Sequence, residues 1–149
     1  MRNVTSANKL FYLYLLPRGR VKLLETVLAK RLGLHVWTVR AAKRALKEQG
    51  LLIDHKPHVG AASVLEALEC ETFKDWPCRK RELPKAVLET PVASRLVWLY
   101  LSGVNDAQTL SDLAEGLDVS YATVRRGIEP LKPYLDIVGA NPMHLKLAA

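Results

Sequence analysis

The sequence has few cysteines and no long apolar run. Its two cysteines, Cys70 and Cys78, are too few for a disulfide scaffold. The longest apolar runs, residues 10–16 and 96–101, are far shorter than the roughly 20 residues that cross a bilayer. The N-terminus also lacks a basic segment followed by a long apolar stretch, the mark of a secretory signal. These absences predict a cytoplasmic protein that has no membrane partner.

Signatures of catalysis are also missing from the sequence. It contains no P-loop, no Gly-x-Ser-x-Gly and no cluster of carboxylates, so we expect that the protein is not an enzyme and needs no cofactor. His55, His58, Cys70 and Cys78 could in principle hold zinc. However, H-x2-H followed by C-x7-C fits no closed zinc spacing, so we expect no metal site.

Positive charge is concentrated in the first part of the chain. The whole chain has a net charge of +7, but residues 1–60 hold 12 basic and three acidic side chains, which gives +9. Residues 61–89 and 90–149 each hold five basic and six acidic side chains, which gives −1 for each. A local excess of this kind favours a phosphate-binding face, and nucleic acid before lipid, although it could also be a solvated surface.

The chain contains an internal repeat at an offset of 85 residues. Residues 28–47, LAKRLGLHVWTVRAAKRALK, align without a gap with residues 113–132, LAEGLDVSYATVRRGIEPLK. Between positions 11 and 57 there are ten identities, where composition alone gives roughly three or four. The sequence therefore predicts two copies of one folding unit.

Each copy has the periodicity of three short helices. The first helix is predicted at residues 8–16 and 93–101, where a strand is the competing prediction, and the second at residues 24–32 and 110–117. Gly33 and Asp118 tolerate the left-handed backbone of a tight turn, and the third helix begins near His35 and Ser120. Thr109 with Asp112 resembles a capping box.

A β-hairpin follows the third helix in the second copy, with strands around an Asn141-Pro142 turn. In the first copy residues 61–68 fit either a returning strand or a helical stripe. The predicted fold is therefore mainly α with small β-hairpin wings. We expect a first domain at residues 1–60, a linker at 61–89 and a second domain at 90–149.

These features resemble the winged helix-turn-helix superfamily in a tandem arrangement. The resemblance rests on L-A-x-x-L-(G/D)-(L/V)-x-x-x-T-V-R, at residues 28–40 and 113–125. It implies a sequence-specific protein that binds double-stranded DNA through the third helix of the first domain, acts as a transcription regulator, and in a prokaryote is nucleoid-associated. Plasmid or phage replication initiators, partition factors and winged-helix scaffolds of chromosome segregation are the alternatives.

The resemblance also implies which residues contact DNA. In the first copy Thr38, Arg40 and Arg44 are the candidates for base contacts, with Lys43 and Lys47 on the phosphates. Trp37 either faces DNA or packs under the helix. Additional candidates lie on the second helix, at the wing and in the second copy: Lys30, Arg31, Lys56, Tyr121, Thr123, Arg125 and Arg126.

The second copy departs from the pattern at the end of its third helix. Glu129 and Pro130 stand where the first copy has Arg44 and Ala45. Because proline lacks the backbone donor and clashes with the preceding turn, we expect this helix to kink or stop at Pro130. The second domain therefore either binds DNA more weakly or contacts a protein, which could be a second copy of the chain.

Overall fold

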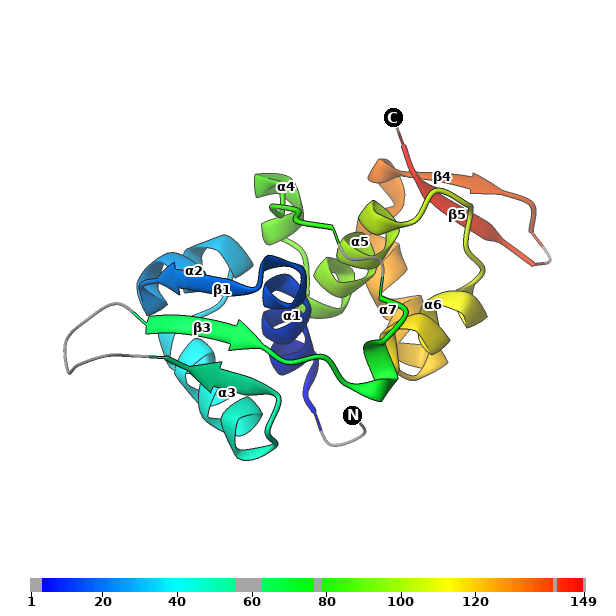
Figure 1. Ribbon diagram of the computed structural model, residues 1–149. Helices are drawn as coiled ribbons and strands as arrows, with labels where there is room; N and C mark the ends of the chain where they lie inside the picture. The colour runs from blue at the N-terminus through cyan, green and yellow to red at the C-terminus, as the bar shows by residue number, and fades with distance from the viewer. Residues whose placement is uncertain (1–3, 56–62, 77–78, 141, 149) are drawn as a thin grey trace. The chain divides into compact units, whose positions relative to one another are not determined.

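The computed structural model of the chain describes residues 4–55, 63–76, 79–140 and 142–148. It is mainly helical with small antiparallel sheets, as the sequence predicted, and forms two compact units, Val4–Lys74 and Asp75–Ala149 (Figure 1). Within the described ranges, every helix is too short or too polar to cross a membrane.

The first unit consists of helices and a three-stranded sheet. Its main elements are α1 (Ser6–Leu15), β1 (Arg20–Leu23), α2 (Glu25–Leu32), α3 (Val36–Glu48), β2 (Leu52–Asp54) and β3 (Ser63–Ala67). The sheet order is β1-β3-β2 and both pairings are antiparallel, with Glu66 of β3 opposite Arg20 on one side and Ile53 on the other. Strands β2 and β3, which follow α3 in the chain, pair as an antiparallel hairpin.

Helix α1 is the buried centre of the first unit. Its residues 10–15 are at most 1% exposed, which explains why its sequence is apolar all round. Because the segment is a helix, the competing strand prediction for residues 8–16 is wrong. Thr5 caps the helix by accepting a hydrogen bond from the Asn8 backbone N–H at 3.2 Å. The Tyr12 hydroxyl donates to the Leu68 carbonyl at 2.5 Å, and burial raises the pKa of Tyr12.

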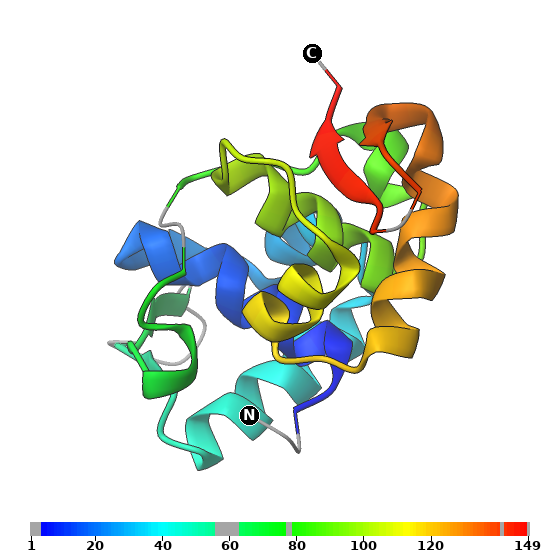
Figure 2. The same ribbon diagram turned by 90° about the vertical axis from the view of Figure 1, so that its right-hand side faces the viewer.

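The second unit has a similar order of elements. They are α4 (Lys85–Leu88), α5 (Val92–Gly103), α6 (Leu110–Leu117), α7 (Tyr121–Ile128), β4 (Leu135–Val138) and β5 (His144–Leu147). Figure 2 shows α5, α6 and α7 in green, yellow and orange, grouped beside the hairpin of β4 and β5. Gln108 and Leu145 exchange two backbone hydrogen bonds, of 2.8 and 2.7 Å, so that β5 lies between Gln108 and β4.

The 85-residue offset carries helices of one unit onto helices of the other. It maps both ends of α2 onto both ends of α6, and the first residue of α3 onto the first residue of α7. The predicted turns are confirmed, because Gly33 and Asp118 both adopt the left-handed conformation, with φ of 65° and 53°. The capping box between Thr109 and Asp112 is also confirmed.

The stretch predicted as a linker, residues 61–89, has a different structure. Its part Ser63–Ala67 is strand β3, which pairs with both β1 and β2 and belongs to the first unit. Trp76 and Val87 are buried in the second unit. Of the two alternatives for residues 61–68, strand and helix, the strand is therefore the one observed. The division between the units falls between residues 74 and 75.

Gly127 sets how closely α5 and α7 approach each other. A Cβ at this position would lie 2.9 Å from the backbone oxygen of Ala93, which cannot rotate away. We expect Gly127→Ala to lower the free energy of unfolding by about 1–3 kcal/mol, because the two helices must separate to admit the methyl group. This loss exceeds the gain of about 1 kcal/mol that alanine has over glycine in helix propensity. Urea unfolding measures this change. Ala122→Ser, at an exposed position of the same helix, is the control, and a Gly127→Ala variant as stable as the parent contradicts the argument.

Candidate nucleic-acid interface

Helix α3 has one fully buried face and one exposed cationic face. Val39, Ala42 and Leu46 are fully buried against the first unit's core. The opposite face carries an exposed stripe with the spacing i, i+3, i+7 and i+10: Trp37, Arg40, Arg44 and Lys47. We call these four residues the α3 stripe. A helix with its side chains is about 10–12 Å wide, which fits the roughly 12 Å width of the DNA major groove.

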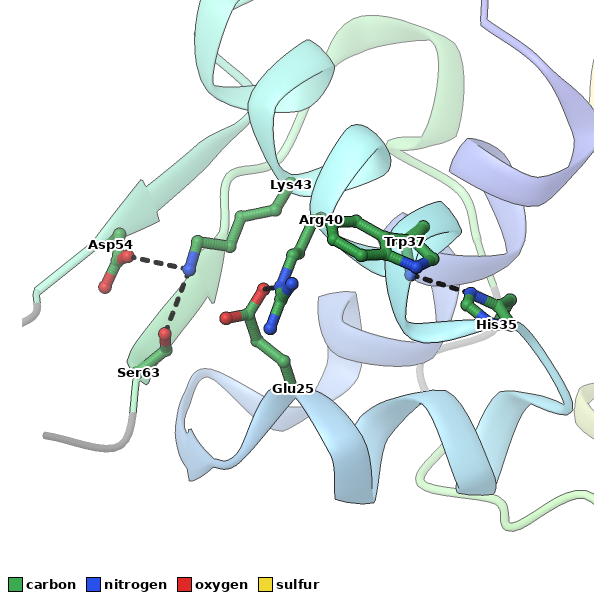
Figure 3. A network of polar contacts seen from close by, with 7 residues as sticks. All are labelled: Glu25, His35, Trp37, Arg40, Lys43, Asp54 and Ser63. Carbon is green, nitrogen blue, oxygen red and sulfur yellow. Dashed lines mark hydrogen bonds and ion pairs between the residues drawn. The ribbon is translucent and has the colours of Figure 1, made fainter. Parts of the chain in front are cut away.

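Trp37 begins the α3 stripe, in the first turn of the helix. Its side chain is 66% exposed, so the alternative that it packs under the helix is wrong. The Nδ1 atom of His35 accepts the Trp37 backbone N–H at 3.2 Å and fixes the start of the helix (Figure 3). Trp37 therefore faces solvent at the end of the stripe where the helix begins.

Arg40 lies between Trp37 and an acidic residue of α2. Its guanidinium carbon is 5.0 Å from the centre of the Trp37 ring, and its Nε atom is 3.4 Å from Oε2 of Glu25 (Figure 3). Its side chain remains 46% exposed. These contacts orient the guanidinium and leave part of it available for a ligand in front of the helix.

Arg44 and Lys47 are exposed and make no hydrogen bond or ion pair within the described part of the chain. Together with Arg40, Glu25 and Glu48 they line a shallow hollow of about 360 Å³. Two cations with no anionic partner close together repel each other, and an external anion placed between them relieves that repulsion. This part of the α3 stripe is therefore suited to a phosphate or to the acceptor atoms of a base.

Lys43 has a structural position that the sequence did not indicate. Its Nζ atom is 3.3 Å from Oδ2 of Asp54 and donates to Oγ of Ser63 at 3.0 Å (Figure 3). The side chains of Lys43 and Asp54 are only 16% and 7% exposed. The sequence placed Lys43 on the phosphates with Lys47, but its ammonium is instead engaged within the first unit, where this side chain connects α3 to the sheet.

The other candidates of the first unit lie around α3 and α2. Thr38 is half-buried, and Lys30 and Arg31 are exposed at the end of α2. Arg31 donates from Nη1 to the hydroxyl of Tyr14 at 3.4 Å, so it is partly engaged in its own unit. Lys56 lies outside the described residues, as do His58 and Cys78 of the zinc alternative.

In the second unit the corresponding surface is shorter and less basic. Tyr121, Arg125 and Arg126 are exposed on α7, whereas Thr123 is half-buried and its backbone N–H donates to the Ser120 hydroxyl that caps the helix. Helix α7 ends at Ile128 and a 3₁₀ segment with Pro130 follows, which confirms the predicted stop. The positions equivalent to the α3 stripe hold Ala122, Arg125, Glu129 and Lys132, and the last two form an ion pair of 2.7 Å.

Sequence reasoning missed the acidic residues that hold the basic ones. Glu25 orients Arg40, and Glu66 accepts from Nε2 of His55 at 2.9 Å and lies 3.7 Å from Nε of Arg20. The position of Glu25 in the first turn of a predicted helix was the one available signal. The contacts of Glu66 depend on the register of β3, which the sequence did not predict.

Comparisons of the chain with protein-family models, with curated proteins and with solved structures gave no match. The functional argument therefore rests on the chain's own geometry, and above all on the α3 stripe, in which Glu25 orients Arg40.

Proposed function

We propose that the chain is a sequence-specific double-stranded DNA-binding protein that regulates transcription. In this proposal it consists of two winged helix-turn-helix domains in tandem, and α3 of the first domain enters the major groove. The strands of each unit that follow the third helix act as its wing. DNA binding of this kind needs neither catalysis nor a cofactor.

The α3 stripe is the observation that carries the proposal. A 13-residue helix presents an aromatic residue and three cations on one side, while its other side is anchored in the core. Arginine can donate two hydrogen bonds to the O6 and N7 atoms of guanine, and lysine neutralises phosphate. Residues 1–60, with the α3 stripe included, have a net charge of +9, which attracts a polyanion from a distance.

The second unit supports a subordinate role in the same proposal. At the position of Arg44 it has Glu129, whose carboxylate repels phosphate and already pairs with Lys132. Its shorter helix α7 leaves Arg125 and Arg126 as the cations near the helix start. We propose that this unit binds DNA more weakly than the first or contacts a protein.

The test is the binding of the purified chain to a labelled 20-base-pair duplex over a series of salt concentrations. We expect the logarithm of the binding constant to fall with the logarithm of the salt concentration with a slope of about −3 to −4. This slope corresponds to four cations of the first unit on phosphates or base edges: Arg40, Arg44, Lys47 and Lys30. Fluorescence anisotropy measures it. If the chain has no affinity for duplex DNA at 50 mM salt, the proposed function is wrong.

Lys47 is expected to contribute affinity without sequence preference. Because a lysine ammonium on a phosphate makes no base contact, Lys47→Ala should weaken binding to all duplexes alike and make the salt slope less steep by about 1. Anisotropy titrations on three unrelated duplexes measure both quantities. Lys132→Ala, the equivalent substitution in the second unit, is the matched control and should change the slope less. An unchanged slope in Lys47→Ala would remove Lys47 from the interface.

A further inference from the structure

We propose that Trp37 is a specificity-determining residue that recognises the C5-methyl group of a pyrimidine in the major groove. The methyl group belongs to thymine or to 5-methylcytosine. This inference rests on the proposed function and names the base feature that the first turn of α3 selects.

The exposure of Trp37 leaves apolar surface available to a ligand. Trp37 is 66% exposed, so most of this large apolar residue remains in water. It does not lie on the buried face of α3, which is formed by other residues of the helix. Hydrophobic side chains gain free energy in proportion to the apolar area removed from water. The ring is therefore a site at which contact with an apolar group of a ligand adds affinity.

Contacts of Trp37 restrain both its ring and its backbone. Arg40 lies over the ring at 5.0 Å from its centre and is itself held by Glu25, and the backbone N–H of Trp37 is bound to His35 (Figure 3). A ring oriented before binding loses less conformational entropy on binding than a mobile one. Trp37 also occupies the first turn of the helix, and in this class of motif the first residues of the recognition helix contact base edges.

The chemistry of the major groove then selects the partner. Base edges in this groove expose hydrogen-bond donors and acceptors and a single kind of apolar group, the C5-methyl of a pyrimidine. Apart from its single N–H donor, an indole ring placed on donors and acceptors would remove water from them without replacing its hydrogen bonds, which is unfavourable. Contact with the methyl group buries apolar surface on both sides, so methylated pyrimidines are preferred.

The experiment compares duplexes that differ by one methyl group. The best duplex is first selected from a pool with a randomised 20-base-pair centre, and each thymine in it is then replaced singly by deoxyuridine, which keeps every hydrogen-bonding group. At one position we expect wild type to bind the thymine duplex about three- to fivefold more tightly than the deoxyuridine duplex, the factor given by burial of one methyl group. Trp37→Ala should bind the two duplexes equally.

Cytosine and 5-methylcytosine at the same position distinguish the two sources of the methyl group. A thymine preference over deoxyuridine identifies thymine as a ligand, and a matching preference for 5-methylcytosine over cytosine shows that the second base serves as well. Tyr134→Ala is the control, since Tyr134 is a 40% exposed aromatic residue outside the predicted DNA contacts, and it should keep the discrimination of wild type. Far-UV circular dichroism checks that each variant is folded.

Three outcomes overturn the inference while the proposed function stands. They are a tight duplex in which no thymine can be replaced with loss of affinity, a Trp37→Ala variant that still discriminates, and a Trp37→Ala variant that loses single-strand binding while its binding of the selected duplex is unchanged. The last would make Trp37 a stacking platform for unpaired bases. Absence of any duplex binding by wild type would instead contradict the proposed function itself.

Discussion

Replacing Arg40 and Arg44 together by alanine is expected to weaken binding to the selected duplex about 100- to 1,000-fold at 100 mM salt. Each arginine that holds a guanine or a phosphate contributes about 1–3 kcal/mol, and 1.4 kcal/mol corresponds to a factor of ten. The two residues are one helical turn apart, so their contributions need not be strictly additive. We expect affinity for unrelated duplexes to fall less, because the lost contacts include those to bases. Anisotropy titrations on selected and unrelated duplexes measure the ratio.

The control for this variant is the double substitution of Arg125 and Arg126 by alanine in the second unit. We expect it to weaken binding less than tenfold, because its helix is shorter and lies in a region of net negative charge. Stability of the first unit should change little in the Arg40→Ala and Arg44→Ala variant, since the ion pair to Glu25 is half-exposed and such pairs contribute about 0–1 kcal/mol. If the two double variants lose equal affinity, α3 is not the principal DNA-reading helix.

Replacing Lys43 by methionine is expected to lower the free energy of unfolding of the first unit by about 2–3 kcal/mol. The variant keeps the length of the side chain but removes the cation 3.3 Å from the Asp54 carboxylate, in a place that is nearly closed to water. Breaking a fully buried ion pair costs about 3–5 kcal/mol, and the remaining exposure of Lys43 reduces that value. Urea unfolding followed by circular dichroism measures the loss.

Two further variants separate this structural role from DNA binding. Lys47→Met removes an exposed cation from the same helix and should change stability by less than about 0.5 kcal/mol. The double variant Lys43→Met with Asp54→Leu replaces the pair with apolar side chains and should recover much of the lost stability. A Lys43→Met variant of full stability but with greatly reduced DNA affinity would instead support the phosphate contact that the sequence suggested.

The parts of the fold that the sequence predicted are those decided by a few neighbouring residues. The left-handed turns at Gly33 and Asp118, the cap at Thr109 and the stop before Pro130 each depend on the chemistry of one to four consecutive positions. The buried faces of α2, α3 and their counterparts followed from helical periodicity.

The parts that the sequence did not predict depend on residues distant in the chain. Strand β3 is defined by its pairing with residues 20–23 of β1 and residues 52–54 of β2, which lie much earlier in the chain. The spacing of its apolar residues by itself also suits a helix. The engagement of Lys43 required Asp54 and Ser63 to be brought together by that pairing. The sequence predicted which residues form the α3 stripe. It did not predict that Glu25 orients Arg40 or that Trp37 is exposed, because both depend on how the helices pack.

The early end of α7 has a consequence for any DNA target that both units occupy. Helix α3 has 13 residues and is about 20 Å long, the rise of roughly six base pairs, whereas the eight residues of α7 extend about 12 Å, or three to four base pairs. A duplicated chain with equal helices would favour two equivalent half-sites. Under the proposed function, these unequal helices favour two unequal half-sites, so that a single bound molecule has a defined orientation on its target.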